Sequence, residues 1–287
     1  MRRIPVFKKR RAQPPAATGA QVITLDYPVD STPRYGYGRP PHRRLYQRLE
    51  RGRADYAALL EQFLTLTEHL CAIPRDETGR IERPCWRNGW LAGLDVVALY
   101  SLLALTNPKR YLEIGSGTST RFARQAIREH ALGTTVTSID PHPRSEVDSL
   151  CDEVIRKPLE RADLSIFGEL TEGDVLFVDG SHRTLMNSDV TVAFLDILPD
   201  LQPGVLVEMH DIYLPWDYPP EWAQRFYSEQ YLLAAYLLAP EQPFDVVLPN
   251  FFATIEPDLA GILQPLWSRL ELTDFDTWGQ SFWLRTR

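Results

Sequence analysis

From Arg110 onward, short apolar segments alternate with longer amphipathic ones, and this alternation constrains the fold more than any other feature. Strands separated by helices are typical of a parallel sheet with helices on both faces. Runs such as "VLFV" and "VLV" are apolar at every position, as expected for strands buried on both sides. The predicted strands are "RYLEI", "TTVTSID", "DEVIRK", "DVLFVD", "GVLVEMHD", "FDVVL" and "SFWLR". The sequence therefore predicts an α/β fold.

The first 109 residues are organised differently. Residues 1–44 are rich in Pro, Gly and Arg and lack apolar periodicity, which predicts an extended or disordered basic arm. Residues 45–109 form a predicted helical segment, with an amphipathic helix over 45–73 and an apolar helix over 91–106. Residues 110–287 form the predicted ligand-binding domain. Because the arm has no apolar face, its first 40 residues are predicted to be dispensable for folding.

Charge and composition limit the partners that we expect. The net charge of the 287 residues is −7, yet 12 of the 31 Lys and Arg, against only 3 acidic residues, lie in the first 51 positions. An acidic body disfavours nucleic-acid binding, while the basic arm is either solvated or an anchor for a polyanion. No apolar run reaches the roughly 20 residues that span a bilayer, and the three cysteines suggest neither disulfides nor zinc. We expect a cytoplasmic protein without membrane contact.

The stretch "YLEIGSGTST", residues 111–120, combines a strand end, a Gly-x-Gly turn and a helix start. Gly115 and Gly117 allow a ligand to approach the backbone, at the edge of the sheet where α/β proteins bind ligands. A dinucleotide fingerprint requires a third glycine at position 120, where this chain has Thr. Asp140 ends the next strand, where a carboxylate can accept hydrogen bonds from both hydroxyls of a ribose. The alternatives are a purely structural turn, and a capping role for Asp140.

Taken together, "YLEIGSG", "VTSID" and "DVLFVDG" resemble the class I S-adenosylmethionine-dependent methyltransferases over roughly residues 88–249. The resemblance implies a Rossmann-like, seven-stranded, mostly parallel sheet whose last strand is antiparallel, with helices on both faces and an N-terminal helical extension. It also implies S-adenosylmethionine as the cofactor. Its methionine part would lie near Glu113, Gly115 and Gly117, and its ribose on Asp140.

Two further strands end in an Asp and a His. "DVLFVDGSH" presents Asp179 and His182, and "GVLVEMHD" presents His210 and Asp211. The sheet order implied by the resemblance brings these four residues together beside the methyl group. His182 is predicted to begin a helix, whose dipole would keep the imidazole neutral and able to act as a general base. Asp179 and Asp211 would orient the acceptor hydroxyl.

The same residues suggest a metal. "DGSH" is similar to a stretch of the macrocin-type sugar O-methyltransferases that carries a metal-ligating Asp and a catalytic His. Asp179, His210 and Asp211 are therefore candidate ligands for Mg²⁺ or Mn²⁺. The family has an acidic pair where this chain has His210 and Asp211, which puts the metal in doubt, and His210 has a structural alternative as a donor to a carbonyl. The aromatic stretch 213–222 is either a wall of the acceptor pocket or packing beneath the next helix.

The function predicted from these features is methyl transfer from S-adenosylmethionine to a hydroxyl of a small molecule, such as a sugar or a secondary metabolite. One alternative is a binding or scaffold protein that keeps the donor fold without turnover. Another is a metal-dependent hydrolase or hydroxylase that uses the Asp and His residues. The expected partner is a small-molecule acceptor, and formation of a homo-oligomer is left open.

Overall fold

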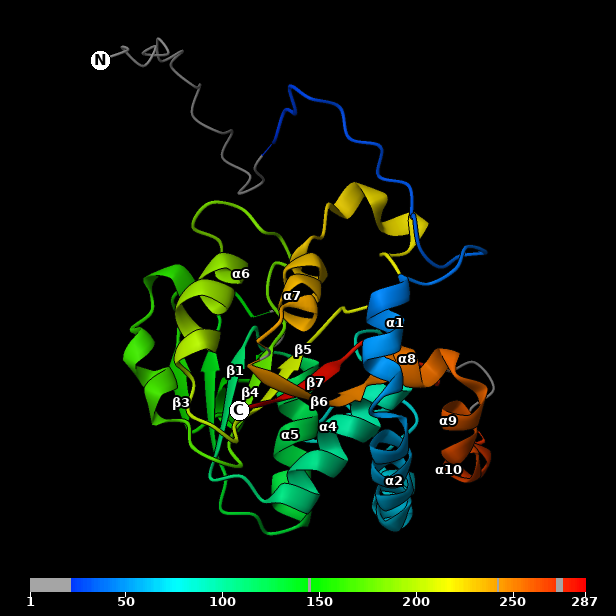
Figure 1. Cartoon of the computed structure of the whole chain (residues 1–287). Helices are drawn as coiled ribbons and strands as arrows, with labels where there is room; N and C mark the ends of the chain where they lie inside the picture. The colour runs from blue at the N-terminus through cyan, green and yellow to red at the C-terminus, as the bar shows by residue number, and fades with distance from the viewer. Residues whose placement is uncertain (1–21, 144–145, 242, 272–275) are drawn as a thin grey trace, which may run out of the picture.

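The computed structural model describes residues 22–143, 146–241, 243–271 and 276–287, and these residues contain a seven-stranded Rossmann-like sheet (Figure 1). The strand order is β3-β2-β1-β4-β5-β7-β6. β7 runs antiparallel to both of its neighbours, and the other strands are parallel to one another. The predicted sheet is thus confirmed. The strands are β1 (Arg110–Ile114), β2 (Thr135–Ile139), β3 (Glu153–Ile155), β4 (Val175–Val178), β5 (Leu206–Met209), β6 (Phe244–Pro249) and β7 (Phe282–Thr286).

The central strands are buried on both faces because their side chains are apolar at nearly every position. All four residues of β4 and all four of β5 are buried. The helices that connect the strands supply the covering layers, and α4 packs against α5. The connecting helices are α5 (Thr118–Glu129), α6 (Asp189–Val192), which continues as a short π-helix and a 3-10 turn to Asp200, and α7 (Glu229–Leu238).

The predicted helix over residues 45–73 is divided into shorter pieces. A break at Gly52 separates α1 (Arg43–Glu50) from α2 (Arg53–Phe63), and a 3-10 turn precedes α3 (Thr67–Ala72). The predicted apolar helix is α4 (Gly93–Thr106), nearly all of whose side chains are buried. The buried residues of these helices belong to the same hydrophobic core as the strands, so the core continues from Leu45 to Leu284.

Three helices that the sequence reasoning did not anticipate lie between β6 and β7. They are α8 (Asn250–Ile255), α9 (Pro257–Ile262) and α10 (Gln264–Leu270). α9 packs against α2, and α10 packs against α3, at the lower right of Figure 1. Each is only six or seven residues long, which is too short for a clear helical period in the sequence.

The N-terminal arm, whose first 40 residues are predicted to be dispensable for folding, contacts the rest of the protein over residues 34–42. The backbone N–H of His42 donates to the carbonyl oxygen of Pro215 at 2.9 Å, and the Tyr37 ring meets the Trp216 ring edge to face. Gly36 lies so close to Trp216 that a Cβ there would be 2.3 Å from the indole. Residues 22–33 have no helix or strand, and residues 1–21 of the predicted arm lie outside the described residues.

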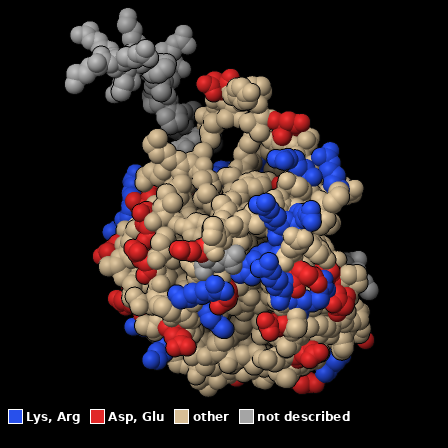
Figure 2. All heavy atoms as spheres, in the orientation of Figure 1, with Lys and Arg blue, Asp and Glu red and all other residues tan. Residues whose placement is uncertain are grey.

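Acidic and basic side chains are interspersed over the face of the molecule seen in Figure 2, with basic side chains gathered over its right half. This face therefore does not carry a continuous surface of one charge. Across the part of the chain that the structure describes, every helix is too short or too polar to span a bilayer.

The effect of an N-terminal deletion on stability should depend on whether residues 31–42 are kept. A chain that starts at Ser31 keeps the contacts with residues 213–217, so its melting temperature should stay within about 2 °C of the full chain. A chain that starts at Arg43 loses backbone hydrogen bonds and an aromatic pair, together about 2 kcal/mol, which corresponds to roughly 4–8 °C. Calorimetric unfolding measures both. Equal melting temperatures for the two deletions would show that residues 34–42 contribute nothing to stability.

Candidate functional site

The glycine turn after β1 is pressed against the end of β4. Gly115 has a φ of +80°, and a Cβ on this residue would lie 1.9 Å from the carbonyl oxygen of Asp179. The backbone N–H of Asp179 in turn donates to the carbonyl oxygen of Ile114 at 2.9 Å. Glycine is required at position 115 for two reasons. The two strand ends approach more closely than any side chain allows, and the backbone is in the left-handed region, which glycine adopts without strain.

A cavity of about 680 Å³ opens above this turn, and we call it the Asp140 cavity. The Asp140 carboxylate is held in place by the backbone N–H groups of Ser116, at 2.9 Å, and of His142, at 2.7 Å. The carboxylate is therefore fixed at the end of β2, where the sequence placed it. Other lining residues come from the turn after β1, from residues 158–160 and from the loop after β4.

Glu113 lies beneath the turn and does not line the Asp140 cavity. Its carboxylate accepts hydrogen bonds from the hydroxyls of Ser119 and Thr120 at the start of α5, and from Tyr111 at 3.2 Å. Burial raises the pKa of Glu113 to about 8, against the opposing effect of these hydroxyls. Gly117 is also outside the lining, and its N–H donates to Thr120 Oγ1 at 3.0 Å. Glu113 and Gly117 therefore hold the turn in its shape without lining the cavity.

A second cavity, of about 700 Å³, lies on the other side of Asp179, and we call it the His182 cavity. It brings together the four residues expected at the ends of β4 and β5, namely Asp179, His182, His210 and Asp211. Asp179 lines both cavities and is the one residue common to their linings among the described residues. The two cavities therefore meet at a single carboxylate.

His182 lies among three carboxylates. Its Nε2 is 3.1 Å from Asp179 Oδ1 and 3.4 Å from Asp211 Oδ2, and its Nδ1 is 2.8 Å from Glu229 Oε2. Burial lowers the pKa of His182, but the hydrogen bonds to Asp179 and Glu229 and the charge of Asp211 raise it more, so it lies well above its usual value. The surrounding carboxylates therefore favour the protonated form of the imidazole. Its charge compensates carboxylates that would be costly to bury alone.

The predicted position of His182 at a helix start is wrong. The residue lies in the loop between β4 and α6, with a left-handed φ of 58°, and α6 begins only at Asp189. A helix that begins at His182 therefore does not set its protonation, and the raised pKa runs against the predicted neutral imidazole. The N-terminus of α7 holds the loop instead, because the N–H groups of Ser228 and Glu229 donate to the His182 carbonyl oxygen at 2.8 and 3.2 Å.

Glu229 is the member of this cluster that the sequence reasoning missed. It is 1% exposed and comes from the first turn of α7, 47 positions from His182. An acidic residue at the start of a helix is common enough that nothing in the sequence singles it out. Burial raises the pKa of Glu229, and the neighbouring imidazole opposes that rise.

The residues proposed as metal ligands are arranged differently. His210 Nδ1 faces Glu208 Oε1 and Ser281 Oγ, both at 3.2 Å, and its Nε2 is 3.3 Å from the Gln280 side-chain amide. Both ring nitrogens are thus engaged in the protein interior. The His182 imidazole lies where a cation between Asp179 and Asp211 would be expected. Within the described ranges, no group of three or more His, Cys, Asp and Glu side chains is suited to bind a metal ion. The residues therefore do not fit Mg²⁺ or Mn²⁺.

The aromatic stretch 213–222 divides between the lining of the His182 cavity and a packed hydrophobic cluster. Trp222 lines the His182 cavity, together with Tyr227, Trp86 and Trp278. Tyr213, Tyr218 and Phe251 form a small separate hydrophobic cluster, against which Trp216 packs. The last residue of the stretch therefore forms part of the cavity wall, and Tyr213, Trp216 and Tyr218 are packed in the hydrophobic cluster.

Part of this chain matches a known family model, and solved structures of low sequence identity resemble it. Residues 112–212 match a family model described as a methyltransferase domain, and this range contains both strand ends of the His182 cavity. A search of curated protein sequences found no match. Similar solved structures include the methyltransferase PaMTH1 of Podospora anserina, bound to SAH, with 18% identity over 68% of this chain and 78% of that chain and a TM-score of 0.40. Another is an O-methyltransferase from Bacillus cereus in complex with SAH, with 16% identity over 80% and 91% of the two chains and a TM-score of 0.37.

Substitution of Gly115 should disrupt the site through the backbone. Gly115→Ala should destabilise the protein by at least about 1–2 kcal/mol from the left-handed φ alone, with further loss from the contact with Asp179. The matched control is Gly133→Ala, because a Cβ at Gly133 meets no atom within 4 Å and its φ is not in the left-handed range. Thermal unfolding of the two variants makes the comparison. If Gly115→Ala melted like Gly133→Ala, the close approach of the two strand ends would be refuted.

Proposed function

We propose that this protein is an S-adenosylmethionine-dependent methyltransferase that acts on a hydroxyl group of a small molecule. The observation that carries the proposal is that two cavities meet at Asp179, one lined by the glycine turn and Asp140, the other by the His and Asp residues. A methyl transfer requires such an arrangement, because donor and acceptor must be aligned on either side of one point. The methyltransferase-domain match over residues 112–212 supports the same proposal.

The donor would occupy the Asp140 cavity. Asp140 would accept hydrogen bonds from the ribose hydroxyls, since its carboxylate is already oriented by two backbone N–H groups. The turn at Gly115 keeps side-chain atoms away from the cavity floor. When bound, S-adenosylmethionine supplies an electrophilic methyl group on a sulfonium. Glu113 and Gly117, which the sequence assigned to the donor, would act on it indirectly by holding the turn.

The acceptor would occupy the His182 cavity, where the chain has to orient one hydroxyl and remove one proton. Asp179 and Asp211 would orient the hydroxyl, as both line the cavity beside His182 Nε2. His182 would take the proton at Nε2 in its deprotonated form. Glu229 is a positioning residue, because its contact with Nδ1 fixes the ring and directs Nε2 toward the cavity.

Donor binding provides the first test. Wild-type protein should bind S-adenosylmethionine and S-adenosylhomocysteine in calorimetric titrations without added metal. Asp140→Ala should weaken binding by about 1–3 kcal/mol through loss of charge-assisted hydrogen bonds. Asp55→Ala, an exposed residue of α2, is the control and should bind like wild type. A wild-type protein that binds neither compound would overturn the proposed function.

The pH dependence of turnover tests the roles of His182 and Glu229. The pKa of His182 is raised, so its proton-accepting form becomes more abundant as pH increases, and turnover should rise into the alkaline range. Glu229→Gln removes one of the charges that raise this pKa, so the rise should shift to lower pH. The assay follows transfer of a labelled methyl group to an acceptor found by screening.

His182→Gln provides the baseline for this profile. Its turnover should be lower by about 10² to 10⁴, without the alkaline rise, while donor binding is nearly intact. If Glu229→Gln lowered turnover equally at every pH, Glu229 would have a structural role only. An unchanged turnover in His182→Gln would remove His182 from the reaction.

A further inference from the structure

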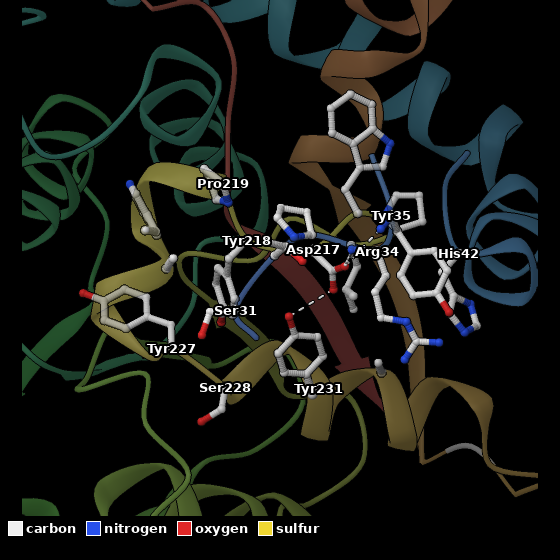
Figure 3. A pocket seen from close by; sticks show the side chains of 18 of the residues that line it. Ser31, Arg34, Tyr35, His42, Asp217, Tyr218, Pro219, Tyr227, Ser228 and Tyr231 are labelled. Atoms are coloured by element: carbon white, nitrogen blue, oxygen red, sulfur yellow. Dashed lines mark hydrogen bonds between the residues drawn. The ribbon is translucent and has the colours of Figure 1, made fainter. Parts of the chain in front are cut away.

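A third cavity, of about 700 Å³, lies between the N-terminal strap, the loop after β5 and α7, and we call it the Asp217 cavity (Figure 3). The strap is residues 29–42. No residue lining the Asp140 cavity lines this one, so it is separate from the site proposed for the donor. Its volume falls within the roughly 300–1,000 Å³ that is typical of small-molecule sites.

The Asp217 carboxylate joins the three walls of this cavity. Its Oδ2 accepts hydrogen bonds from the backbone N–H groups of Arg34, at 2.6 Å, and of Tyr35, at 3.0 Å. Its Oδ1 accepts a hydrogen bond from the hydroxyl of Tyr231, on α7, at 3.0 Å, as a dashed line in Figure 3 shows. The walls of the cavity are therefore held together by hydrogen bonds between the strap, the loop and the helix. The carboxylate is 9% exposed and its oxygens are engaged in these bonds.

The lining is largely aromatic and aliphatic. Figure 3 shows the rings of Tyr35, Tyr218, Tyr227 and Tyr231 arranged around the space. α7 adds an apolar stripe at helical spacing, in which Tyr231 and Leu238 are 48% and 40% exposed. The stripe also includes Ala234 and Ala235. Flat rings and small aliphatic groups favour a planar apolar ligand. The Asp217 carboxylate is engaged by its hydrogen bonds, and the Arg34 guanidinium lies over the Tyr35 ring, 5.5 Å from the ring centroid.

We propose that the Asp217 cavity is a second ligand site, which binds an uncharged molecule or group that contains aromatic rings. Trp222 and Tyr227 line both this cavity and the His182 cavity. A ligand in the Asp217 cavity therefore contacts the wall of the proposed acceptor site. The assignment does not depend on the methyl transfer reaction, because it rests on the lining and the hydrogen bonds of the cavity itself.

The test uses N-phenyl-1-naphthylamine, an uncharged fluorescent compound with aromatic rings, whose emission increases when it is buried. Wild-type protein should bind it saturably at one site. Ala223→Trp and Ala235→Trp place an indole in the cavity from two different elements, and each should weaken binding at least about 10-fold. Ala260→Trp is the matched control, because Ala260 is an exposed residue of α9 that lines none of the three cavities, and it should bind like wild type.

Calorimetry with S-adenosylhomocysteine separates this proposal from the proposed function. All four proteins should bind S-adenosylhomocysteine equally, and a saturating amount should leave the affinity for the fluorescent compound within about twofold. The absence of S-adenosylhomocysteine binding would count against the proposed function alone. The second site is overturned if wild-type protein does not bind the fluorescent compound, or if both cavity variants bind it as tightly as Ala260→Trp does.

Discussion

The burial of His182 among three carboxylates is the interaction on which the rest of the site depends. The imidazole connects Asp179 at the end of β4, Asp211 after β5 and Glu229 on α7, which are otherwise separate elements. Removal of the imidazole would leave these carboxylates without a compensating positive charge in a largely buried position, which is costly. The same contacts set the protonation of the imidazole and hold the loop that separates two cavities. Structure and proposed chemistry therefore depend on one cluster.

In this cluster the His182 imidazole occupies the position that a divalent cation would take between Asp179 and Asp211. In a group of carboxylates at a sheet edge, a divalent cation is one means of compensation and a protonated imidazole is another. Here the imidazole lies between Asp179 and Asp211, and His210 is engaged by Glu208, Ser281 and Gln280. An expectation based on residue types alone did not distinguish these two arrangements, because both require carboxylates and histidines at the same strand ends.

Much of the fold was predictable from the sequence, because strand burial and helix amphipathicity leave a direct record in residue order. The glycine turn after β1 and the position of Asp140 were likewise predicted from strand ends, and the meeting of Asp179, His182, His210 and Asp211 at one cavity was predicted from the sheet order that the family resemblance implies. Contacts between distant segments were not. Glu229, the packing of residues 34–42 on residues 213–217, and the short helices α8 to α10 depend on tertiary neighbours that local patterns do not specify. The raised pKa of His182 was not predicted for the same reason, since it depends in part on Glu229, 47 positions away in the chain.

His182 is a buried imidazole whose pKa is raised well above its usual value by the carboxylates around it. Nitrogen NMR of the histidine side chains, with His182→Gln used to assign the signal, measures this directly. Both ring nitrogens of His182 should carry protons at pH 7, and the residue should lose its proton only at a pH above the ordinary histidine pKa. A His182 signal that is neutral at pH 7, or that titrates near the ordinary value of about 6.5, would show that the carboxylates do not stabilise the protonated ring.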